Sequence, residues 1–180
     1  TGMIEANGCV DLANPGKTLE AGYTKLEGHT AFAVETDLSM VGQYVDIYVR
    51  DGQVMGAPCA STQAVSYTLD SVQTLVELCK SSDYHVDDDA AVYLNYVPVE
   101  GGLSALPTAA SVTVLDRDGD LGLETILALE TTACTVTGTN PLTIQVGGAT
   151  VEARSMRTGQ GYVAGQSARC VQVAGTWYVN

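Results

Sequence analysis

The sequence has few basic residues. Its 8 Lys and Arg stand against 21 Asp and Glu, so the formal net charge is −13. Nucleic-acid binding needs a basic surface that neutralises phosphates, and anionic membrane surfaces also attract basic segments. The charge therefore argues against nucleic acid and against membrane adhesion. It is compatible with cation binding and with high solubility in an extracellular setting.

Long apolar runs and closely spaced cysteines are also missing. No apolar run approaches the roughly 20 residues of a membrane-spanning helix, so we expect no membrane span. The spacing of the cysteines excludes a CxxC unit and a compact zinc site. We expect buried free thiols, with one adventitious disulfide as the alternative. The five cysteines are Cys9, Cys59, Cys79, Cys134 and Cys170.

Disorder is excluded by composition, because 46% of the residues are hydrophobic and only 16% are charged. A chain of 180 residues has room for one domain or two small ones. At this length a protein buries roughly 70% of its unfolded surface. The chain therefore needs no disulfide or metal in order to fold.

The sequence is mostly typical of β structure. Residues 45–56, 141–153 and 168–179 each contain two strand-like segments joined by an Asp-Gly, Gly-Gly or Ala-Gly dipeptide. Such dipeptides accept the positive φ of tight hairpin turns, so each segment predicts a β-hairpin. Further strands are expected at residues 31–35, 90–97, 111–114, 125–129 and 132–137.

One segment, residues 69–80, has helical periodicity instead. Val72, Leu75, Val76 and Cys79 follow the i, i+3, i+4, i+7 spacing of one helix face. Asp70 with Gln73 three residues later resembles a capping box. Residues 81–89 are expected to form a polar connection after this short helix.

Residues 100–108 are the best candidate for a domain boundary, since they contain Gly-Gly and Pro without a clear period. We therefore predict a β module over residues 1–100, with a short helix near 70–80, and a second β module over residues 101–180. The boundary is soft and the two halves are expected to pack together. The predicted fold class is mainly β, with small barrel-like or sandwich-like modules.

An acidic segment in the second module is the sharpest chemical feature of the sequence. Asp116, Asp118 and Asp120 recur at every second position, and Glu124 follows four residues later. Ca²⁺ takes six to eight oxygen ligands, and alternating carboxylates on a tight turn supply them. We therefore expect these four residues to form a calcium site. The alternative is a solvated Asp/Gly hairpin without metal.

The segment does not match an EF-hand, because position 12 of such a loop would be Leu127 instead of an acid. Strand-like sequence on both sides favours a strand–loop–strand calcium turn. Leu121 stands where such turns usually have glycine. A second acidic cluster, residues 83–89, contains His85 and three consecutive aspartates. Metal ligation there is conceivable, but consecutive side chains diverge, so we interpret it as a solvated turn.

Catalytic motifs are sparse. The chain has two histidines, and Gly-x-Ser-x-Gly, His-Glu-x-x-His and phosphate-binding glycine loops are absent. A dyad of Cys59 with His29 is not supported by any local motif. We therefore predict that the protein is not an enzyme. A carboxylate-dependent hydrolase remains a third possibility, with Asp46/Asp51 or Glu130/Glu152 as its acid pairs.

Aromatic residues could form a sugar-binding platform, which makes a glycan- or protein-binding adhesion module the second hypothesis. Residues of this kind are more often half-buried strand positions whose hydroxyls reach water. The candidates are Tyr44, Tyr48, Tyr93, Tyr96, Tyr162, Trp177 and Tyr178.

Residues 41–56 and 112–124 together resemble β-rich repeat modules of secreted Gram-positive proteins that carry S-layer-homology domains. Those modules combine a Gly-x-x-Val-x-x-Tyr strand with an aspartate-rich turn between strands, and the two segments cover about a sixth of the chain. The S-layer-homology anchoring motif itself is not visible in the sequence.

The resemblance implies an extracellular, cell-wall-associated module of a longer surface protein. Its role would be structural or for display, and calcium would bind at the acidic turn. Its partners would be neighbouring domains, cell-wall glycan or a host protein. A cytosolic protein with reduced thiols is the other location that the sequence leaves open.

Overall fold

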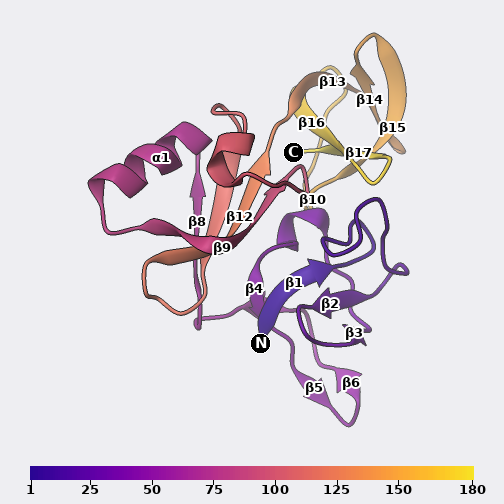
Figure 1. The fold of residues 1–180 in the computed structure, drawn as a ribbon. Helices are drawn as coiled ribbons and strands as arrows, with labels where there is room; N and C mark the ends of the chain where they lie inside the picture. Colours follow the sequence, from indigo (N-terminus) through magenta and orange to yellow (C-terminus); the bar gives the residue numbers. More distant parts are fainter.

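The computed structural model describes residues 1–180 and shows a mainly β protein with one α-helix (Figure 1). We divide it into an N-terminal unit (residues 1–64), a central sheet unit (residues 65–131) and a C-terminal barrel (residues 132–180). Each unit has its own β-sheet. The predicted fold class is confirmed, and the expected small barrel is the C-terminal unit.

The N-terminal unit is built on a five-stranded sheet with strand order β3-β2-β1-β4-β7. A short 3₁₀ helix, η1 (Leu38–Met40), precedes β4, and a two-stranded hairpin lies between β4 and β7. The strands of the sheet are β1 (Gly2–Ala6), β2 (Thr24–Leu26), β3 (Ala31–Phe32), β4 (Tyr44–Asp46) and β7 (Cys59–Ala60).

The first predicted hairpin is present as β5 (Val49–Arg50) and β6 (Gln53–Val54). Asp51 and Gly52 at its turn have φ of 50° and 78°. Both values are positive, as a type I′ turn requires. The Asp-Gly dipeptide therefore sets this turn by the mechanism expected from the sequence.

The central unit is a five-stranded sheet of order β10-β9-β12-β11-β8, in which β9 and β12 are parallel. Helix α1 (Val72–Ser81) packs on it: Val72 and Leu75 share a buried cluster with strand residues such as Val112 and Ile126. The strands are β8 (Val65–Leu69), β9 (His85–Leu94), β10 (Val97–Pro98), β11 (Ser111–Asp116) and β12 (Gly122–Leu129), and the 3₁₀ helix η2 covers Gly102–Ala105.

Helix α1 begins later than the capping prediction placed it. Ser71 is the N-cap, and its Oγ accepts a hydrogen bond from the backbone N–H of Thr74 at 3.0 Å. The predicted capping box of Asp70 with Gln73 is therefore wrong. Asp70 accepts a bond from the Thr74 hydroxyl instead. Asp70 and Ser71 are both residue types that cap helices, and the Ser71 hydroxyl is the one that reaches the backbone N–H of Thr74 in the first turn.

The expected polar connection over residues 81–89 is also too long. Strand β9 begins at His85, so the three consecutive aspartates lie in a strand instead of a solvated turn. Its first residues pair in parallel with the beginning of β12, with His85 opposite Gly122 and Val86 opposite Leu123. This long-range pairing overrides the local preference of a run of aspartates for a turn.

The C-terminal barrel closes in the order β13-β14-β15-β17-β16 around Cys134, Val136, Ile144, Cys170 and Val179. Both hairpins predicted for this region are present, and all four of their turn residues have positive φ. The strands are β13 (Thr132–Thr139), β14 (Leu142–Val146), β15 (Ala149–Ser155), β16 (Ser167–Val173) and β17 (Thr176–Val179).

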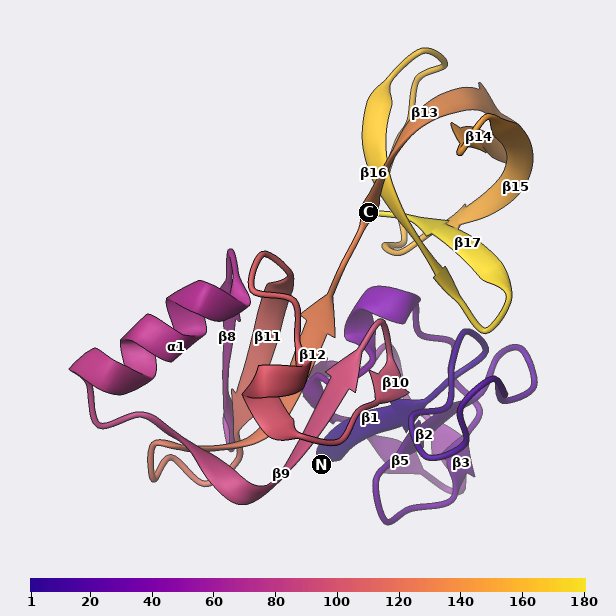
Figure 2. The ribbon, with the colours of Figure 1, turned by 45° about the horizontal axis from the view of Figure 1, so that its top comes forward.

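The three units pack on one another around a shared core (Figure 2). The buried cluster of the N-terminal unit includes Tyr96 and Leu115 from the central unit and Met156 and Tyr178 from the barrel. The central sheet takes strands from both sides of residues 100–108, and η2 lies within that segment. The division into residues 1–100 and 101–180 stays a prediction.

All five cysteines are free thiols. Cys9, Cys134 and Cys170 are buried, Cys79 is half-buried and Cys59 is exposed. Burial raises the pKa of the Cys170 thiol to about 12, and a hydrogen bond with Cys134 adds to that shift. No helix is both long enough and apolar enough to cross a membrane.

Candidate metal site

The acidic turn joins β11 to β12. Asp116 is the last residue of β11, and the antiparallel register that pairs Leu115 with Thr125 brings Glu124 back beside it. One carboxylate oxygen from each of Asp116, Asp118, Asp120 and Glu124 lies within 4.8 Å of all the others. The structure therefore brings together all four residues that the sequence predicts as metal ligands.

Backbone amides fold the loop around these carboxylates. Asp116 is only 2% exposed. Its Oδ1 accepts a hydrogen bond from Gly119 N–H at 2.7 Å, and its Oδ2 accepts one from Leu121 N–H at 3.2 Å. Glu124 Oε2 accepts from Arg117 N–H at 2.8 Å. Asp118 and Asp120 are exposed and form the solvent-facing side of the site.

The loop needs left-handed backbone at two positions. Gly119 has φ of 75° and Leu121 has φ of 72°. The residue at which the sequence departs from the usual turn, Leu121, thus occupies a conformation that favours glycine. This conformation costs a side chain roughly 1–2 kcal/mol. The bond from Leu121 N–H to Asp116 and that from His85 N–H to Leu121 C=O hold it in place.

The carboxylates repel one another. The Asp120 backbone amide lowers the pKa of Asp118, but desolvation by the surrounding loop and the neighbouring carboxylates of Asp120 and Asp116 outweigh it and raise that pKa. Burial likewise raises the pKa of Glu124, and the charges of Asp118 and Asp116 add to the shift. The hydrogen bond from Gly122 N–H lowers the pKa of Asp120. A bound cation would relieve this repulsion.

A fifth carboxylate lies beside the turn. The parallel pairing of β9 with β12 brings Asp87 to Gly122: a Cβ on this glycine would lie 2.5 Å from Asp87 Oδ1 and 2.9 Å from Asp120 Oδ1. His85 Nε2 is 3.2 Å from the same Asp87 oxygen. The sequence did not predict that Asp87 and His85 approach the site, because the pairing joins segments more than thirty residues apart.

Arg117 connects the turn to the N-terminal unit. Its guanidinium Nη2 donates to Glu27 Oε2 at 2.9 Å and to Thr125 Oγ1 at 3.4 Å. The hydrogen bond to Glu27 is the main cause that raises the pKa of Arg117. The Nε of the same side chain is buried without a hydrogen-bond partner.

The candidate catalytic residues lie on different elements and loops of the fold. No hydrogen bond joins His29 to Cys59. The His29 ring packs against the Phe32 ring at a tilt of 44°, with centroids 6.1 Å apart, and the Cys59 thiol donates to the backbone oxygen of Asp46. Asp51 lies in the exposed turn of the β5–β6 hairpin. Glu130 and Glu152 are exposed surface acids.

The aromatic residues do not form a single exposed platform either. Tyr96 and Tyr178 are buried, and burial raises the pKa of both phenols. Tyr48 is 60% exposed on the N-terminal unit. In the C-terminal barrel, the Tyr162 hydroxyl forms a hydrogen bond of 2.8 Å with the Ser155 hydroxyl.

Comparisons with known proteins do not add a family to this geometry. No protein-family model matches the chain, and searches of curated proteins and of solved structures find no match. The acidic cluster itself, which could hold a metal ion, therefore has to support any functional conclusion.

Proposed function

We propose that this chain is a non-catalytic structural or display module of an extracellular, cell-wall-associated bacterial protein, and that calcium at the acidic turn stabilises it. The observation that carries the proposal is the convergence of Asp116, Asp118, Asp120 and Glu124 within 4.8 Å. The resemblance of residues 41–56 and 112–124 to modules of S-layer-homology proteins supports the location. Neighbouring domains of the same surface protein would be its partners.

Calcium suits the chemistry of the turn better than softer metals do. All four side chains offer carboxylate oxygens, and Ca²⁺ takes six to eight oxygen ligands in flexible geometry. Zinc and copper sites include thiolate or imidazole ligands in most proteins, and this cluster offers neither. The nearby Asp87 carboxylate adds negative charge, which strengthens the attraction for a divalent ion.

The test is a thermal melt in millimolar CaCl₂ and in EDTA. A ligand that binds only the folded state stabilises it by about 2.7 kcal/mol at 100 times its Kd, so Tm should rise by several degrees in calcium. Asp118→Asn should remove most of that rise, because it removes the negative charge of one exposed ligand. It should leave Tm in EDTA nearly unchanged.

Asp51→Asn is the matched control, since it makes the same charge change at an exposed turn in the N-terminal unit. It should retain the full calcium-dependent rise. A wild-type protein with no rise would reject the calcium proposal. A rise of undiminished size in Asp118→Asn would place the ion elsewhere.

A further inference from the structure

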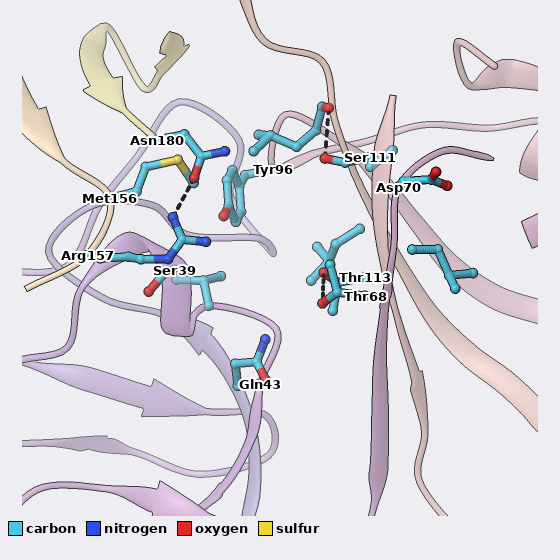
Figure 3. A pocket seen from close by; sticks show the side chains of 15 residues that line it. Ser39, Gln43, Thr68, Asp70, Tyr96, Ser111, Thr113, Met156, Arg157 and Asn180 are labelled. Atoms are coloured by element: carbon cyan, nitrogen blue, oxygen red, sulfur yellow. Dashed lines mark hydrogen bonds between the residues drawn. The ribbon is translucent and has the colours of Figure 1, made fainter. Parts of the chain in front are cut away.

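A cavity of about 380 Å³ lies where the three units meet (Figure 3). The N-terminal unit contributes Ser39 and Gln43, the central sheet contributes Thr113 and Tyr96, and the barrel contributes Arg157. Small-molecule sites occur preferentially at such interfaces and have volumes of about 300–1,000 Å³. The location and size of this cavity are therefore those of a ligand site, and it is separate from the acidic turn.

Tyr96 supplies an unpartnered polar group to the cavity. Its side chain is 9% exposed and packs in the shared core, yet no group of the chain hydrogen-bonds its hydroxyl. Burial raises the pKa of this phenol, so it stays protonated and able to donate. The hydroxyl oxygen itself keeps contact with solvent, so a ligand in the cavity would accept its hydrogen bond in place of water.

Tyr96 lies in the two-residue turn of the β9–β10 hairpin. Asn95 and Tyr96 have φ of 51° and 64°, and a bulky aromatic residue rarely adopts such values. The turn is held by Asn95 N–H, which donates to Ala128 C=O at 2.9 Å, and by Asn95 Oδ1, which accepts from Glu130 N–H at 2.8 Å. Both φ values are positive, as a two-residue type I′ hairpin turn requires, so the hairpin itself accounts for this backbone and fixes Tyr96 at the cavity.

The chemistry of the walls restricts the ligand. The charged side chains are one cation, Arg157, and one anion, Asp70. The remaining polar groups are hydroxyls and amides, including the Thr68 and Thr113 hydroxyls, which lie 3.2 Å apart on the wall opposite Tyr96 (Figure 3). Balanced charge disfavours a multiply charged ligand, and this density of polar groups disfavours a lipid.

The walls also have an apolar part, formed by residues such as Leu127 and Met156. Hydroxyl and amide groups beside an apolar surface match a sugar ring, which carries hydroxyls at its edge and C–H groups on its faces. Arg157 donates one bond to Asn180 Oδ1 and keeps further N–H groups available. We propose that this cavity binds a neutral saccharide, to which the Tyr96 hydroxyl and the Arg157 guanidinium donate hydrogen bonds.

The test is saturation-transfer NMR followed by titration with defined sugars. The neutral probes are glucose, galactose, mannose, N-acetylglucosamine, maltose and cellobiose at up to about 10 mM, a concentration suited to weak sites with millimolar Kd. The charged probes are glucuronate and glucosamine. We expect at least one neutral sugar to bind and both charged analogues to bind more weakly.

Tyr96→Phe keeps the ring and deletes the hydroxyl. It should weaken sugar binding by about tenfold, the upper range for a single hydrogen bond, and should leave Tm nearly unchanged because the hydroxyl makes no hydrogen bond within the chain. Tyr48→Phe, on the exposed surface of the N-terminal unit, should change neither property. Thr113→Val tests the opposite wall and should also weaken binding.

Three outcomes would overturn the proposal. In the first, no neutral sugar binds. In the second, a charged analogue binds more tightly than every neutral sugar. In the third, Tyr96→Phe and Thr113→Val both bind as tightly as the wild-type protein. None of these outcomes depends on calcium, so the saccharide site and the calcium site can fail separately.

Discussion

Single residues decide whether the acidic turn can form. The spacing of Asp116, Asp118, Asp120 and Glu124 was enough to predict their convergence, because a hairpin turn between two strands returns the chain on itself. The contribution of Asp87 could not be predicted in the same way, since it depends on the parallel pairing of β9 with β12. Gly122 lies between the Asp87 carboxylate from β9 and the Asp120 carboxylate of the turn.

Gly122→Ala should therefore damage the site selectively. The new Cβ would lie 2.5 Å from Asp87 Oδ1 and 2.9 Å from Asp120 Oδ1, so both carboxylates would have to move. We expect the calcium-dependent rise in Tm to shrink by at least half, and a loss of about 1–3 kcal/mol of stability in EDTA from overpacking.

Gly161→Ala is the control for that substitution, because nothing lies within 4 Å of a Cβ at this position. It should change the free energy of unfolding by less than about 0.5 kcal/mol. Calcium-dependent melts of both variants make the comparison. An unaltered calcium response in Gly122→Ala would show that Asp87 and Asp120 do not approach one another there.

At the scale of elements, the strands next to glycine-containing hairpin turns were predictable, and so were those expected at residues 31–35, 90–97, 111–114, 125–129 and 132–137. Strands β1, β2, β7 and β8 were not predicted. The turn dipeptides determine the local register of the β5–β6, β14–β15 and β16–β17 hairpins. Strand β1 escaped prediction because four of its five residues are buried, so its sequence does not alternate. Such strands are recognisable only from their long-range partners.

Helix η1 shows how one element is attached to another unit. Asp37, just before it, accepts hydrogen bonds from the Ser39 hydroxyl at 2.6 Å and from Thr158 N–H of the barrel unit at 2.7 Å. Partial burial alone would raise the pKa of Asp37, but these hydrogen bonds outweigh burial and hold it below its ordinary value of 3.8. Asp37 thus stabilises the folded protein in its ionised form.

The lowered pKa of Asp37 predicts how the stability of the protein depends on pH. A carboxyl whose pKa is lowered by folding contributes stability above its unfolded pKa, and that contribution is lost as the pH falls through the folded pKa. Asp37→Asn should cost about 1 kcal/mol at pH 7. The difference between wild type and variant should shrink below about pH 4.

Urea unfolding at pH 7 and pH 3 measures this difference, with Glu35→Gln as the control at an exposed acid on the same connection. The control should match the wild-type protein at both pH values. A cost of Asp37→Asn that is equal at pH 7 and pH 3 would mean that the charge of Asp37 does not contribute to the attachment.

At the scale of the whole molecule, the packing of the units depends on a close contact between Gly42 and Leu127. Gly42 has φ of +85°, and a Cβ there would lie 2.0 Å from Leu127 Cδ1 in the central sheet. From the sequence we expected the two halves to pack together, but a contact between Gly42 and Leu127 joins residues too distant in the chain for any local pattern to reveal. Val41 and Gln43, on either side of the glycine, line the cavity between the units.

Comparing Gly42→Ala with Gly28→Ala should therefore separate two contributions to the loss of stability: the strain of a left-handed backbone and the overpacking of the contact between units. Gly28→Ala introduces a side chain at a similar φ of +78° with nothing within 4 Å, so it should cost only the roughly 1–2 kcal/mol of left-handed strain. Gly42→Ala should cost about 1–3 kcal/mol more, because it also overpacks the contact. Urea unfolding of both variants gives the two free energies.

Leu127→Ala in the Gly42→Ala background tests the source of the additional cost. If the clash with Leu127 causes it, the double variant should lose less stability than the sum of the two single substitutions, since the truncated side chain makes room for the new methyl group. Additive losses, or equal losses in Gly42→Ala and Gly28→Ala, would mean that the two units do not pack at Gly42. The cavity between them would then lack the fixed walls that sugar binding requires, so this double-mutant cycle also tests the structural basis of the proposed saccharide site.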